Sequence, residues 1–218
     1  MDGNRCETVD TQGTTVDDLV AIGRLLDSPR LAYIWFTLYV EGGIASEESD
    51  SDFISWEGLT VSDLSEYLDG EVPQSTPYND MSEMEEVGAL RVESDGQPTG
   101  YSSKFFQTDA ENVEKIGGGG LVGPQIVGLV GEAFTDKAVL KFIDAYSYGL
   151  LNDVLQMYTA SLRGQLNHSF YEVLPDVDSD DLKSIVPAIE RVLLGMSRAP
   201  LWGEDFRPDL STIDTRVE

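Results

Sequence analysis

The sequence predicts a mostly helical α+β protein, with a small β-hairpin in its N-terminal half and helices in its C-terminal half. Apolar residues recur at helical spacing over most of the 218-residue chain. Two short runs typical of strands flank a Ser-Asp-Gly-Gln-Pro turn at 94–98. Four consecutive glycines at 117–120 separate the two halves. Together these observations predict two parts that differ in secondary structure.

The first predicted elements are two helices. Apolar residues from Val16 to Leu26 follow helical spacing. Asp27-Ser28-Pro29 then ends one helix and begins the next, because proline suits a first helical turn. The second helix ends at Gly42-Gly43, and the acidic residues 44–58 form an inserted loop.

Two shorter helices follow the insertion. Thr60 begins the first, and Asp63 makes a weaker form of the capping box with it. The second runs from about 76 to 87, with Ser75 as its N-cap and Gly88 at its end.

A β-hairpin is predicted next, with strands over 89–93 and 99–106. The order of helix, short helix, turn, short helix and hairpin is typical of the winged helix-turn-helix. In that arrangement the second short helix enters the major groove of DNA.

The C-terminal half is predicted to be helical over about 123–133, 136–147, 149–163, 167–174 and 179–195. Within 139–162, apolar residues cover more than one helix face. One interpretation is a buried central helix pair. Another is a ligand pocket lined by Tyr146, Tyr148 and Tyr158. A third is a homodimer interface formed by Ile143, Tyr146, Leu150, Val154 and Met157.

These patterns predict five segments. They are a disordered lead (1–15), a winged helix-turn-helix domain (16–107) with the insertion 44–58, a Gly-rich connector (108–122), a helical dimerisation and possible sensor domain (123–198), and a tail (199–218).

The net charge of -26 comes from 40 acidic and 14 basic residues. The acids are spread along the chain, which argues against an acidic tail and leaves a cation-binding surface, a nucleic-acid mimic or adaptation to high salt. Lysines are few, and acids take the surface positions that lysine usually fills, which favours a halophile. In molar salt the Debye length is about 3 Å, so self-repulsion is weak.

Several classes of function are excluded by composition. One cysteine and one histidine leave no disulfide framework and no zinc site, so we expect no metal and no cofactor. Gly118-x-Gly120-x-x-Gly123 lacks the apolar strand of a dinucleotide site, and Asp176-x-Asp178-x-Asp180 lacks the rest of a calcium loop. No nucleophile signature accompanies His168, so we expect no enzyme. An acidic start and the absence of a long apolar run predict a cytoplasmic protein without a membrane partner.

The chain resembles the winged-helix transcriptional regulators of haloarchaea, a broad ArsR/TrmB-like group, over residues 27–42, 59–68, 72–90 and 100–106. Pro73-Gln74-Ser75-Thr76-Pro77-Tyr78 is similar to the run that opens the recognition helix in that group. The resemblance implies a homodimer that binds double-stranded DNA, with a helical C-terminal half and an effector that the sequence does not identify.

The predicted DNA-binding residues come from this run and from the hairpin. Facing the groove we expect Gln74, Ser75, Thr76, Tyr78 and Asn79, and contacting the backbone Arg91 and Lys104. Residues 31–90 contain 14 acids and no Lys or Arg, which is unusual because DNA-binding domains place basic side chains on phosphates. Arg24 and Arg30 precede that stretch. On the resemblance, the leading hypothesis is a sequence-specific DNA-binding regulator. The alternative is a degenerate winged helix that binds another protein and does not bind DNA directly.

Overall fold

The computed structural model describes residues 16–42, 58–68, 72, 76–94, 99–103, 124–164, 170, 174 and 177–198. Most of these residues are helical, as the sequence predicts, and a two-stranded antiparallel sheet lies among them. The elements are α1 (Val16–Asp27), α2 (Pro29–Glu41), α3 (Val61–Tyr67), α4 (Thr76–Glu86), β1 (Leu90–Ser94), β2 (Gly100–Ser103), α6 (Pro124–Glu132), α7 (Lys137–Ala145), α8 (Tyr148–Leu162) and α10 (Ser179–Arg198).

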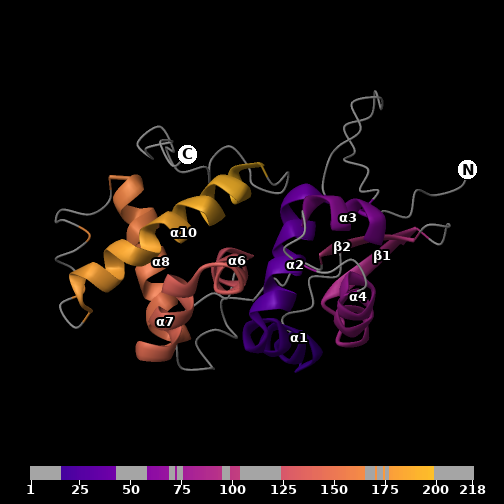
Figure 1. Ribbon diagram of the computed structural model, residues 1–218, viewed down its shortest axis with the longest axis horizontal. Coiled ribbons are helices and arrows are strands. Elements are labelled where there is room, and N and C mark those ends of the chain that lie inside the picture. Colours follow the sequence, from indigo (N-terminus) through magenta and orange to yellow (C-terminus); the bar gives the residue numbers. More distant parts are fainter. Residues whose placement is uncertain are drawn as a thin grey trace, which may run out of the picture.

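Figure 1 shows these elements in two groups joined through α6. Helices α1 to α4 and the hairpin lie on one side, and α7, α8 and α10 lie on the other. A single hydrophobic core includes buried residues from both groups, such as Trp35, Leu129, Phe142 and Ile189. The predicted domain limits between 107 and 123 fall outside the described residues and stay predictions.

Helix α2 connects the elements of the first group. It begins as predicted, because the Ser28 side chain accepts a hydrogen bond from the backbone N–H of Leu31 and Pro29 occupies the first turn. Trp35 is buried, and its Nε1 donates to the backbone oxygen of Ala89 at 2.9 Å. This bond joins α2 to the residue that precedes β1.

The start of α3 and the end of α4 agree with the sequence prediction, whereas Ser75, the predicted N-cap of α4, lies outside the described residues. The Thr60 side chain accepts from the N–H of Asp63 at 3.2 Å, and Asp63 Oδ2 accepts from the N–H of Thr60 at 2.9 Å, which confirms the capping box. Past the end of α4, Gly88 has a φ of 74°, a left-handed conformation that favours glycine.

The hairpin gains one further bridge from the residue before α3. Leu59 and Tyr101 exchange backbone hydrogen bonds of 2.8 and 2.9 Å. Gly58 has a φ of 69°, and a Cβ there would lie 2.8 Å from the Tyr101 backbone, so only glycine fits. Residues 44–57 of the predicted insertion lie outside the described part of the chain.

Helix α6 packs on α2 through two glycines. A Cβ on Gly131 would lie 2.7 Å from the backbone nitrogen of Tyr33, and one on Gly128 would lie 2.7 Å from the Phe36 ring. Because neither glycine has a side chain, the two helices approach closely.

Within the described ranges, none of the helices combines the length and the apolar character that spanning a bilayer requires.

Candidate nucleic-acid interface

Helix α4 has one side turned toward the core. Pro77, Met81 and Met84 are buried there, and so is the carboxylate of Asp80, which is 2% exposed. These positions are three or four residues apart and therefore lie on one side of the helix. The apolar members of this side fix the orientation of α4 against the rest of the fold.

The other side of α4 faces solvent. Tyr78 is 65% exposed, and Asn79, Ser82, Glu85 and Glu86 are exposed as well. Their spacing places all five on one side of the helix. The first turns of this side carry uncharged polar groups, whereas its last turn carries two acids. The side chains of this side that can donate hydrogen bonds therefore lie in the first turns of α4.

Arg30 of α2 pairs with the buried carboxylate of α4. Its Nη2 donates to Asp80 Oδ1 at 2.9 Å, and its side chain remains 45% exposed. Burial raises the pKa of Asp80, an effect that the hydrogen bond from Arg30 opposes. The second oxygen of Asp80, Oδ2, is buried and has no partner among the described residues.

Arg24 of α1 makes the second ion pair with α4. Its Nε donates to Glu83 Oε1 at 2.6 Å, and its Nη2 contacts the same oxygen. Its Nη1 lies 3.4 Å from Asp27 Oδ2, and the side chain is 42% exposed. Two acids of α4 are thus compensated by arginines from outside the acidic stretch 31–90.

The two arginines provide guanidinium groups beside α4 that are partly open to solvent. Nε and Nη1 of Arg30 have no partner in the part of the chain that the structure describes. A guanidinium presents its donors in a planar fork that matches the oxygens of a phosphate. The buried carboxylate of Asp80 fixes one edge of this group, so the remaining donors have a defined orientation.

The sequence-predicted DNA-binding residues are described only in part. Tyr78 and Asn79 lie on the exposed side of α4, and Thr76 is its first residue. Arg91 lies on β1 opposite Ser102. Outside the described residues lie Gln74, Ser75 and Lys104.

The residues predicted for a dimer interface pack against this chain's own core. Val154 is fully buried, so its side chain is not available at the surface. Half-buried beside the core are Ile143, Tyr146, Leu150 and Met157.

The three tyrosines predicted to line a pocket do not surround the cavity described below. Tyr146 donates to Asp181 at 2.8 Å, and Tyr158 donates to Glu190 at 2.5 Å. Both hydroxyls therefore attach their segments to α10. Tyr148, at the start of α8, is 38% exposed.

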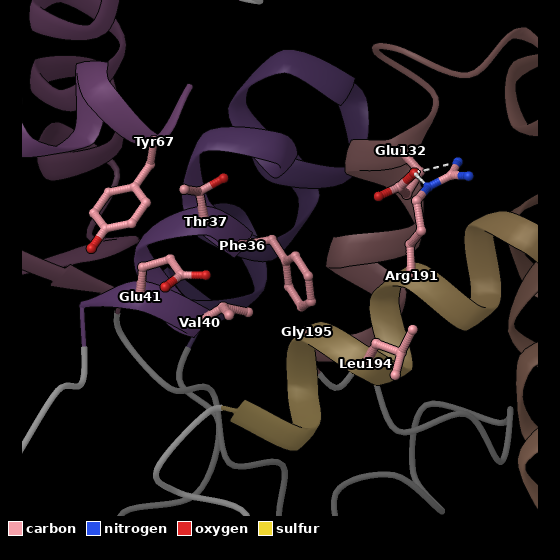
Figure 2. Close-up of a pocket in the computed structure, with 9 residues that line it drawn as sticks. All are labelled: Phe36, Thr37, Val40, Glu41, Tyr67, Glu132, Arg191, Leu194 and Gly195. Atoms are coloured by element: carbon pink, nitrogen blue, oxygen red, sulfur yellow. Dashed lines mark hydrogen bonds and ion pairs between the residues drawn. The ribbon is translucent and has the colours of Figure 1, made fainter. Parts of the chain in front are cut away.

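A cavity lies between α2 and α10 and is shown in Figure 2. It combines residues from four helices, and helical periodicity gives no signal for such a combination. Among the described residues, no group of three or more His, Cys, Asp or Glu side chains is placed to hold a metal ion. Cys6 and His168 lie outside those residues.

Comparison with protein-family models, with curated proteins and with solved structures finds no match to this chain.

Proposed function

We propose that this protein is a DNA-binding transcriptional regulator that reads the major groove with the exposed side of α4. The observation that carries the proposal is the uncharged polar start of this exposed side, with Arg24 and Arg30 beside the helix. An α-helix fits the major groove of B-DNA, and asparagine pairs bidentately with adenine there. Such a protein acts in the cytoplasm and needs no catalytic group.

The order of elements supports a winged helix-turn-helix. Helix α2 is followed by the bridge residue Leu59, then α3, α4 and the hairpin. In this reading α4 is the recognition helix and β1 with β2 is the wing. Arg91 on β1 and the predicted Lys104 would then approach the backbone beside the groove.

Arg30 is proposed as a phosphate contact of this interface. Its Nε and Nη1 have no partner among the described residues, and its Nη2 is held by Asp80. Each phosphate that an arginine neutralises adds to affinity and to its salt dependence. Because the surrounding acids reduce this electrostatic term, base contacts and packing must supply more of the affinity in molar salt.

The proposal is tested by selection from a random-sequence duplex pool with the full-length protein, in parallel at molar KCl and at low salt. We expect one enriched motif. Asn79→Ala should cost about 1–3 kcal/mol and relax one position of that motif. Arg30→Gln should weaken binding to all sequences and reduce the salt slope by about 1. The matched control is Arg163→Gln, which removes an exposed arginine at the end of α8.

Folded protein that enriches no motif at either salt concentration would refute DNA binding. Enrichment that Asn79→Ala leaves unchanged would refute groove reading by α4.

We also propose that the regulator is a homodimer. Three large apolar residues are exposed along the α6–α8 segment, namely Phe134, Leu140 and Tyr148. Light scattering in molar salt should give twice the chain mass of 23.9 kDa, and Leu140→Glu should give monomers. The control is Val20→Glu, at an exposed position of α1. A monomeric wild-type protein would refute this part of the proposal.

A second candidate is a protein-interaction module, favoured by the exposed acids Glu85 and Glu86 at the end of α4. In this case a basic partner protein binds the wild type, and the double variant Glu85→Gln/Glu86→Gln loses that binding. It is distinguished from DNA binding by the selection experiment, because a module of this kind enriches no DNA motif.

A further inference from the structure

The cavity between α2 and α10 is lined by residues of four helices. Its volume is about 480 Å³, within the range of about 300–1,000 Å³ that holds small organic ligands. Figure 2 shows Tyr67 and Glu41 at one end and Glu132 with Arg191 at the other, with the Phe36 ring between them. The cavity is therefore polar at its ends and apolar in its middle.

The apolar middle of the cavity, here called its floor, is fixed in position by packing. Phe36 lies against α6, where a Cβ on Gly128 would be 2.7 Å from its ring carbons. On the α10 side, a Cβ on Gly195 would be 3.3 Å from Phe36 Cε1. Leu194 and Val40 extend this floor. Because the ring fits between two glycine positions, the floor exists before any ligand enters.

The charges at the end of the cavity that holds Glu132 and Arg191 favour a cation. Glu132 is 13% exposed, and Arg191 donates to its Oε2 from Nε at 2.7 Å. Arg191 also donates to Asp136 at 2.7 Å, so two carboxylates already surround this guanidinium. An anionic ligand would have to displace one of them. A cation meets Glu132 without breaking the pair, since a carboxylate accepts several bonds.

The remaining lining adds to this preference. Glu41 contributes a second carboxylate, so the lining holds two acids against one arginine. Phe36 and the 46% exposed Tyr67 contribute aromatic rings, whose faces attract cations. The net charge of -26 acts in the same direction.

From this lining we infer that the cavity binds a small organic cation with an apolar body. The apolar part would lie on Phe36 and Leu194, and the charge would lie between the aromatic rings and the carboxylates. This inference does not depend on DNA binding, and its test uses no DNA.

The test is isothermal titration of the full-length protein in NaCl with three phenyl-substituted probes of different charge, of which the cation and the anion have nearly the same shape. They are tetraphenylphosphonium, neutral triphenylphosphine oxide and anionic tetraphenylborate. We expect the cation to bind at least about tenfold more tightly than the neutral probe, and the anion to show no binding. Equal binding of the three probes, or no binding of the cation, would overturn the inference.

Variants locate the site. Glu132→Gln and Tyr67→Leu should each weaken cation binding several-fold, and Leu194→Trp should abolish it by filling the cavity. Tyr67 is exposed, so its variant remains informative where replacing the largely buried Glu132 unfolds the protein. The control is Asp153→Asn, which removes one exposed charge on α8 and should bind as the wild type does. Cation binding that Tyr67→Leu and Leu194→Trp leave unchanged would place the site elsewhere and overturn the inference.

Discussion

Replacing Gly131 with alanine tests the close packing of α6 on α2. The new Cβ would lie 2.7 Å from the backbone nitrogen of Tyr33, 2.8 Å from its Cα and 3.0 Å from the carbonyl carbon of Ala32. All three atoms belong to the backbone of α2, so no side-chain rotation relieves the overlap and the two helices must separate. Overpacking of this kind costs about 1–3 kcal/mol of unfolding free energy. For a protein of this size, each kcal/mol lowers Tm by about 2–4 °C.

The assay is urea unfolding followed by circular dichroism, with Gly23→Ala as the matched control. Gly23 lies within α1, and a Cβ there meets nothing within 4 Å. Alanine at that position should therefore raise the unfolding free energy by about 0.5–1 kcal/mol, through helix propensity alone. Gly131→Ala as stable as the wild type, or equal to Gly23→Ala, would refute the close packing.

Three further substitutions probe the described contacts. Burial raises the pKa of Asp80 above 3.8, so the folded state holds this proton more tightly than the unfolded state, and the contribution to stability falls as pH rises above about 3.8. Urea unfolding of Asp80→Asn and of the wild type is measured at a series of pH values from about 3.8 upward. The free energy of unfolding of the variant should increase relative to that of the wild type as pH rises. A constant difference between the two would contradict the pKa shift. Trp35→Phe leaves the buried oxygen of Ala89 without its donor and should cost about 1–3 kcal/mol in the same assay; a variant as stable as the wild type would contradict this role of the bond. Thr60→Ala removes the cap of α3 and should lower stability by about 1 kcal/mol. Ser62→Ala, at an exposed position in the first turn of the same helix and outside the capping box, should change stability little.

Features that depend on near neighbours were predictable. Ser28, Thr60 and Gly88 mark helix ends as expected, because each acts on residues only a few positions away. The hairpin followed from its turn residues for the same reason. Short-range stereochemistry therefore accounts for most element boundaries.

The partners of the two arginines were not predictable. Arg24 and Arg30 were recognised only as basic residues that precede the acidic stretch. Their partners Glu83 and Asp80 lie 59 and 50 residues further along the chain. Many acids in the stretch were equally available as partners, and only the packing of α4 against α1 and α2 selects these two.

The apolar stripe in the C-terminal half shows another limit of periodicity. Helical spacing identifies which side of a helix is apolar, but it does not say what covers that side. One of the three interpretations placed Val154 against a second chain, but Val154 is buried within its own chain, as the interpretation of a buried helix pair expects. The cavity beside Phe36 gave no local signal, because its lining comes from separate helices.

Helix α2 joins the two proposed binding sites. Arg30 lies in its first turn, and Phe36 and Glu41 lie in its later turns, within a length of about 20 Å. Thermodynamic linkage requires that a cation in the cavity changes DNA affinity by the same factor by which DNA changes the affinity for that cation. Two titrations, each with and without the other ligand, therefore measure one coupling free energy, and its sign states whether the occupied cavity releases the regulator from DNA or retains it there.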